Sequence, residues 1–219
     1  MTQINVKSQN RVLILHMFLF FIVWSVYALF FSDPIKAVNP YIGVLIKLLV
    51  WTLPVCLIIG LNYKANVLEY LKLKNNNWGK TLFYTGTVGG ILTIWNIVSC
   101  VFLYKKGFSF DKGFSTWLSA VILIGFTEEI IFRGFLLQGL ENLMKFKYAT
   151  LIQSVLFLLI HFPGWYKNSI FVSPVIIGNI LFIFVFALIQ GWLLKKTNSL
   201  WSCILIHTIN NFITIVFGI

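Results

Sequence analysis

The stretch Phe126–Gly134 reads FTEEIIFRG and places Glu128, Glu129 and Arg133 in a run that is otherwise apolar for the thickness of a bilayer. The whole chain has only six acidic residues, and two of them are adjacent here. An ionisable side chain at membrane depth costs about 2.5–3.5 kcal/mol to insert, so such residues are rare and point to function. The three charged side chains are therefore candidate functional residues.

The composition predicts an all-α, polytopic membrane bundle. Of the 219 residues, 59% are hydrophobic, and the mean hydropathy of +0.89 is far above that of a soluble domain. We expect one intramembrane domain over residues 1–219 with about seven transmembrane helices, because the apolar segments follow one another with short connections. The predicted spans cover residues 12–31, 41–61, 81–104, 116–140, 149–162, 174–194 and 200 to the C-terminus, and Pro163 and Gly164 are expected to stop the fifth.

The basic residues indicate how the chain is oriented in the bilayer. A formal net charge of +11 would suggest a nucleic-acid partner in a soluble protein, but here the lysines flank apolar runs and are expected to face anionic lipid. With the N-terminus inside, ten of the 17 basic residues fall in inner segments and five in outer loops, which predicts a cytoplasmic N-terminus. The outer five are Lys36, Lys105, Lys106, Lys112 and Lys167.

Helical spacing separates the two glutamates. Glu129 and Arg133 are four residues apart, so they share a helix face and can pair, which lowers the cost of burying both. Glu128 is offset from Glu129 by about 100° around the helix and has no local cation. It is therefore available as a general base or acid. The alternative is that both carboxylates are structural.

Two later spans carry further polar residues. His161 ends the phrase FLLIH, and His207 and Asn211 are four apart in HTINN, so the last two share a helix face. Histidine and asparagine can both donate hydrogen bonds, which a developing oxyanion requires. Polar contacts between helices would explain the same residues without catalysis.

Together these residues predict hydrolysis of an acyl bond by water. Glu128, with His161, would take a proton from the attacking water, and His207 and Asn211 would stabilise the oxyanion. Glu129 and Arg133 would fix the helix geometry or contact the substrate. Neither GxSxG nor HExxH occurs in the sequence. We predict no metal or cofactor, although two histidines and a carboxylate (Glu128, His161 and His207) could also bind zinc.

The same residues resemble the motifs of a known family. Glu128–Gly134 (EEIIFRG) resembles the EExxxR motif of the CPBP intramembrane proteases, also called the Abi family. Phe157–His161 is similar to its FxxxH motif, and His207–Asn211 to its HxxxN motif. The resemblance covers residues 114–219. It implies a helical intramembrane fold with a polar cavity that opens to the cytoplasm, and a glutamic endopeptidase with the roles given above.

The family contains type II CAAX prenyl endopeptidases and bacteriocin-processing or self-immunity proteins. A small, Lys- and Asn-rich chain that is heavy in Phe and Ile is typical of low-GC Gram-positive bacteria, so we expect a multi-pass protein of the bacterial plasma membrane. The resemblance then implies processing of a bacteriocin or signal peptide, or bacteriocin self-immunity. The expected partners are a membrane-associated peptide substrate, the lipid bilayer and components of a peptide-export or bacteriocin system. A non-proteolytic immunity protein of the same fold is the alternative, and a transporter is disfavoured because no internal repeat is present.

Overall fold

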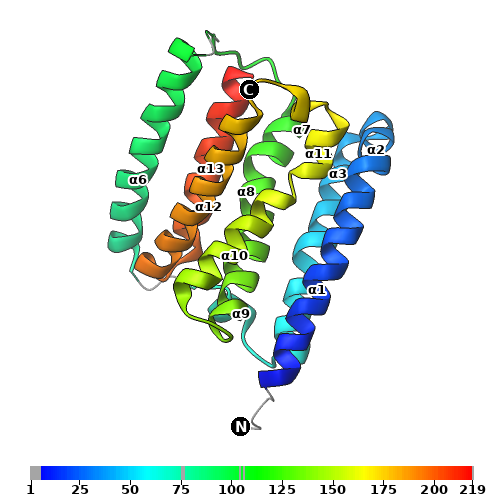
Figure 1. Ribbon diagram of the computed structural model, residues 1–219, viewed down its shortest axis with the longest axis vertical. Coiled ribbons are helices and arrows are strands. Elements are labelled where there is room, and N and C mark those ends of the chain that lie inside the picture. The colour runs from blue at the N-terminus through cyan, green and yellow to red at the C-terminus, as the bar shows by residue number, and fades with distance from the viewer. Residues whose placement is uncertain (1–5, 75–76, 104, 106, 219) are drawn as a thin grey trace.

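A computed structural model describes residues 6–74, 77–103, 105 and 107–218. These residues form a bundle of helices without a strand (Figure 1), which confirms the predicted fold class. Tyr104, at the predicted end of the third span, and Lys106, in a predicted outer loop, lie outside the described residues.

The first two spans form an antiparallel pair on one side of the bundle. Each is a helical run interrupted by π-type turns, and Asn39 caps the second run by accepting a hydrogen bond from the Tyr41 N–H, with Pro40 in the first turn. The elements are α1 (Val6–Val26), η1 (Tyr27–Phe31), α2 (Ser32–Val38), α3 (Pro40–Lys47), η2 (Leu48–Thr52), α4 (Leu53–Leu57) and η3 (Ile58–Asn62).

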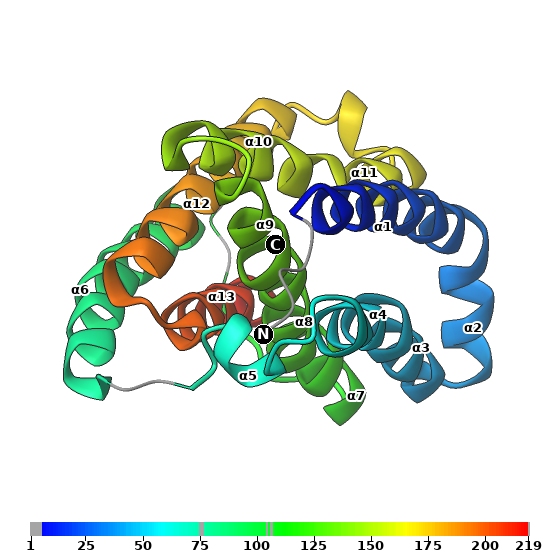
Figure 2. The same cartoon turned by 90° about the horizontal axis from the view of Figure 1, so that it is seen from below.

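The third span lies at the opposite edge of the bundle. The short helix α5 (Val67–Tyr70) leads to α6 (Trp78–Val98) and η4 (Ser99–Leu103). The Asn77 side chain accepts a hydrogen bond from the Lys80 N–H and so caps the start of α6. Figures 1 and 2 show α6 as the outermost helix, on the side of α13 and α12 that faces away from α1.

The helical run that contains FTEEIIFRG passes through the middle of the bundle. It is continuous from Phe114 to Glu141 and consists of α7 (Phe114–Thr116), η5 (Trp117–Leu123), α8 (Ile124–Glu129), η6 (Ile130–Leu137) and α9 (Gln138–Glu141). Every residue of η6 is buried. Seen from below, α9 is enclosed by α1, α4, α10, α12 and α13 (Figure 2). The motif therefore lies at the centre of the protein rather than on its lipid-facing side.

The C-terminal helices complete the bundle. They are α10 (Phe146–Leu159), α11 (Phe162–Lys167), the 3₁₀ turn η7 (Ile170–Val172), α12 (Ile176–Thr197) and α13 (Leu200–Phe217). Pro163 was expected to stop the fifth span, but it lies in the first turn of α11, where a missing N–H costs nothing, so the chain turns at 160–161 and continues as a helix.

Within the described residues, six helical runs are long and apolar enough to cross a membrane: Ser8–Val38, Tyr41–Asn62, Trp78–Phe102, Phe146–Lys167, Ile176–Thr197 and Leu200–Phe217. The chain is therefore a multi-pass membrane protein. The fourth predicted span, 116–140, is not among these six but is the central helical run. With it, the chain crosses the bundle seven times, so α1 begins at one end of the bundle and α13 ends at the other (Figure 1).

One glycine lets two of these helices approach closely. A Cβ atom on Gly125 in α8 would lie 2.8 Å from the Thr208 Oγ1 and 3.1 Å from the Thr208 backbone nitrogen in α13. A methyl group there would push the two helices apart. The absence of a side chain at Gly125 therefore sets the spacing between the motif helix and the last helix.

We expect Gly125→Ala to lower the free energy of unfolding by about 1–3 kcal/mol, because the added methyl group overpacks this contact. Gly90→Ala is the matched control, since a Cβ atom there would meet nothing within 4 Å. Thermal unfolding of both variants in detergent measures the difference. Equal melting temperatures for the two variants would show that the α8–α13 contact tolerates a side chain.

Candidate active site

The predicted ion pair between Glu129 and Arg133 forms and is fully buried. The Arg133 Nη1 donates to the Glu129 Oε1 at 2.9 Å, and both side chains have no exposed surface. The Arg133 guanidinium also lies over the Phe157 ring, 4.1 Å from its centroid. The Arg133 guanidinium thus offsets the cost of removing the Glu129 carboxylate from water, and the Phe157 ring of α10 helps to hold the guanidinium in place.

Helix α13 adds a histidine to the same carboxylate. The His207 Nδ1 lies 2.7 Å from the Glu129 Oε1. A carboxylate only accepts hydrogen bonds, so the His207 Nδ1 carries a proton and donates a hydrogen bond to Glu129. The sequence predicts only Arg133 as a partner of Glu129, but Glu129 also fixes the orientation of the His207 ring.

This orientation turns the other nitrogen of His207 toward Glu128. The His207 Nε2 lies 3.8 Å from the Glu128 Oε2, which is too long for a direct hydrogen bond. Glu128 is 8% exposed, and its Oε2 has no hydrogen-bond partner among the described residues. Arg133 pairs with Glu129 and forms no ion pair with Glu128 among the described residues, in keeping with the offset of the two glutamates on the helix.

Asn211 lies one helical turn beyond His207. Its side-chain nitrogen donates to the Ala120 carbonyl oxygen in η5 at 3.1 Å. One of its two amide hydrogens is thus committed to holding α13 against η5, and the other remains. In the predicted donor pair, the His207 Nε2 and the second amide hydrogen of Asn211 therefore remain for a ligand.

His161 lies at the turn between α10 and α11. Its Nδ1 is 2.9 Å from the Phe157 carbonyl oxygen, which can only accept, so the Nδ1 carries a proton, and in the neutral ring the Nε2 has a free lone pair. The Phe157 ring lies between the two histidines, with its centroid 5.3 Å from that of His161 and 6.0 Å from that of His207. The structure thus brings together the histidine, carboxylate and donor groups that the sequence places on three separate spans.

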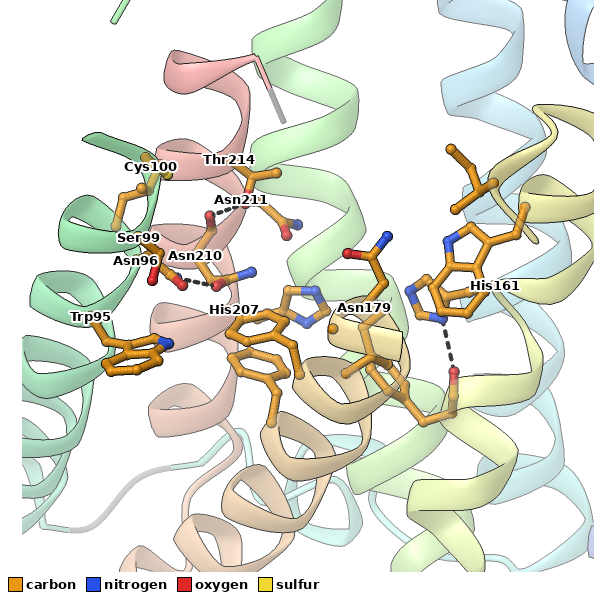
Figure 3. Close-up of a pocket in the computed structure, with 18 of the residues that line it drawn as sticks. Trp95, Asn96, Ser99, Cys100, His161, Asn179, His207, Asn210, Asn211 and Thr214 are labelled. Carbon is orange, nitrogen blue, oxygen red and sulfur yellow. Dashed lines mark hydrogen bonds between the residues drawn. The ribbon is translucent and has the colours of Figure 1, made fainter. Parts of the chain in front are cut away.

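A cavity of about 670 Å³ opens beside these residues (Figure 3). His161, His207 and Asn211 line it, whereas Glu128 is not among the described lining residues and lies 3.8 Å from the His207 Nε2. Among the described residues, no three His, Cys, Asp or Glu side chains are grouped so that they could hold a metal ion, and this includes the set Glu128, His161 and His207.

Three cavity residues were missed by the sequence analysis. Asn96, Asn179 and Asn210 also line the cavity, from α6, α12 and α13. The signal was present in the sequence, because each is a carboxamide within an apolar span, where polar groups are costly and need partners. Only the folded arrangement shows that all three face one space.

The fold and site define a membrane bundle with a buried carboxylate pair and two histidines beside a cavity. Residues 111–213 match the model of the family described as type II CAAX prenyl endopeptidase Rce1-like, a group within the CPBP family. The match covers residues 111–213 of the 219, so this C-terminal part of the chain is similar to membrane endopeptidases of the CPBP kind. The matched residues include all three predicted motifs. No curated protein and no solved structure is matched by the chain.

Removing Arg133 tests whether the buried ion pair is essential for the fold. We expect Arg133→Met to lower the free energy of unfolding by about 3–5 kcal/mol, because it leaves the buried Glu129 carboxylate without its cation. Adding Glu129→Gln should restore part of this loss by removing the charge. The control Lys74→Met breaks the exposed pair with Glu69 and should leave the melting temperature unchanged. An Arg133→Met variant as stable as the wild type would contradict the assignment.

Proposed function

We propose that this chain is an intramembrane glutamic endopeptidase that hydrolyses a peptide bond of a small membrane-associated peptide. The observation that carries the proposal is that His161, His207 and Asn211 line one cavity, with the Glu128 Oε2 3.8 Å from the His207 Nε2. The match of residues 111–213 to a family of endopeptidases supports it independently.

In the proposed reaction, Glu128 and the unprotonated Nε2 of His161 draw a proton from a water molecule in the cavity. The water oxygen forms a bond to the peptide carbonyl carbon, whose π electrons move to the oxygen and give a tetrahedral oxyanion. The oxyanion then re-forms the carbonyl, the C–N bond breaks, and the proton taken from water passes to the leaving amine. The products are a carboxylic acid and an amine, so the reaction needs no reactant besides water.

The oxyanion donors in this proposal are His207 and Asn211. The His207 Nδ1 already donates to Glu129, so the ring must carry both protons to donate a second hydrogen bond through Nε2. Glu129 therefore supports His207 as a donor, and Arg133 holds Glu129. The second amide hydrogen of Asn211 would complete the pair.

A second, apolar groove supports the proposal that the substrate is associated with the membrane. A groove of about 320 Å³ lies between α6 and α12 and shares the residues Trp95, Gly178, Phe182 and Phe186 with the cavity. It would give an apolar peptide a path from the bilayer to the histidines. We propose that the substrate is a bacteriocin or signal peptide, or that cleavage gives bacteriocin self-immunity. The setting we propose is the bacterial plasma membrane, with the N-terminus cytoplasmic and a peptide-export or bacteriocin system as partner.

Substitution of the proposed base tests this function. The chain in liposomes is incubated with a mixture of fluorescence-quenched apolar octapeptides, either free or prenylated on a C-terminal Cys, and the products are identified by mass spectrometry. We expect cleavage of free peptides, and a loss of about 10²–10⁴-fold in rate for both Glu128→Gln and His161→Ala.

Glu141→Gln is the matched control, because Glu141 pairs with Lys195 in the bundle but does not line the cavity. It should cleave at the wild-type rate. Full activity of Glu128→Gln would refute the glutamic mechanism, and cleavage of prenylated peptides alone would replace the proposed substrate class. In bacteria that express the protein and are exposed to a bacteriocin, protection that survives Glu128→Gln would point instead to immunity by binding.

A further inference from the structure

The cavity has a polar wall that the proposed hydrolysis does not use. Asn96 in α6, Asn210 in α13 and Asn179 in α12 all line it, together with the histidines (Figure 3). Each carboxamide lies in a helix that is apolar enough to span the membrane. A carboxamide in such a position needs hydrogen-bond partners, because the surrounding hydrocarbon provides none.

Asn96 and Asn210 form a pair that is only partly satisfied. The Asn96 side-chain nitrogen donates to the Asn210 Oδ1 at 2.7 Å. This bond leaves the oxygen and second amide hydrogen of Asn96, and both amide hydrogens of Asn210, without another partner among the described residues. The pair thus offers both donors and an acceptor to a ligand in the cavity.

Asn179 is the third polar group of this wall. Its side chain makes no hydrogen bond to a described residue, and Figure 3 shows its carboxamide reaching into the cavity in the region between His207 and His161. Asn168 also lines the cavity, but its side-chain nitrogen donates locally to the Gly164 carbonyl oxygen of α11, which it caps.

The chemistry of these groups matches a peptide backbone. A carboxamide carries the donor and acceptor that complement a peptide C=O and N–H. An extended peptide in a membrane cavity has unpaired groups of both kinds along its length and must find partners in the protein. The described lining contains no Asp, Glu, Lys or Arg, and its aromatic residues Trp95, Phe182 and Phe186 suit apolar side chains.

We propose that Asn96, Asn210 and Asn179 form a backbone-binding subsite that holds an extended, uncharged, apolar peptide segment against the catalytic histidines. This inference rests on the proposed function and names the substrate conformation that the site accepts. Asn96 lies outside residues 111–213, so α6 contributes to recognition from a part of the chain that the family match does not include. The three asparagines are positioning residues and take no part in the proton transfers.

Peptide binding in a variant that lacks the proposed base tests the subsite. The Glu128→Gln protein in liposomes is titrated with a fluorescein-labelled decapeptide of Leu, Ala and Val, and its Kd is measured by anisotropy. We expect Asn179→Leu, and separately the double change Asn96→Leu with Asn210→Leu, to raise this Kd about tenfold or more, because each removes one or two hydrogen bonds. The double change avoids leaving one member of the pair unpartnered. Asn142→Leu is the control, because Asn142 is exposed and does not line the cavity, and it should leave the Kd unchanged.

Ester analogues of the decapeptide separate recognition of the backbone from a structural role. Replacing a contacted peptide N–H of the decapeptide by an ester oxygen should raise the Kd for the Glu128→Gln protein. In the asparagine variants of that protein, the ester and the amide should bind equally well. If the asparagine variants melt at a lower temperature but still bind the ester more weakly than the amide, the asparagines only join helices, and the proposal is overturned. An unchanged Kd in the asparagine variants, or no binding of the decapeptide to Glu128→Gln, would also overturn it.

The two proposals can fail separately. If the wild type cleaves the peptide but the asparagine variants bind it as tightly as the parent protein does, only the subsite is refuted. Asparagine-dependent binding without cleavage would leave the subsite standing and refute the endopeptidase function.

Discussion

The structure depends on one buried carboxylate. Glu129 accepts hydrogen bonds from Arg133 within its own helix and from His207 on the last helix, and none of the three side chains is more than slightly exposed. An unpaired carboxylate at this depth would cost several kcal/mol, so the two cationic or polar partners are required for the fold rather than added to it. The same contact directs the His207 Nε2 toward Glu128. Stability and site geometry therefore rest on a single group, and Gly125 makes the contact possible by letting α13 approach α8.

Much of the fold was predictable because bilayer physics leaves few choices. Backbone groups in hydrocarbon must pair internally, so each long apolar segment had to be a helix, and the positions of most spans followed from hydropathy. The local pair of Glu129 with Arg133 followed from four-residue spacing alone. The end of the fifth span was wrong, since Pro163 was taken as a stop. A proline in the first turn of a helix loses no hydrogen bond, so it also marks a restart, and sequence does not distinguish the two.

The contacts between helices could not be predicted in the same way. His207 and Glu129 are 78 residues apart, and nothing in either helix specifies which carboxylate the histidine meets. Which of the two adjacent glutamates accepts a hydrogen bond from His207 depends on the rotation of α13. The bond from Asn211 to Ala120 was likewise invisible, because a backbone carbonyl has no sequence signature. The sequence thus predicts candidate members of the site, whereas the direction of each donor depends on helix rotation.

The first span, which carries no recognised motif, nevertheless supports the site. The Trp24 Nε1 donates to the Ile160 carbonyl oxygen at 3.0 Å, directly before His161, and the Lys167 Nζ at the end of α11 lies 2.8 Å from the Asp33 Oδ2. These bonds fasten the turn that carries His161 at both ends. A carbonyl in this turn would otherwise lack a partner, because the helix breaks there. The placement of His161 therefore depends on residues more than a hundred positions away, which lie outside the three motifs.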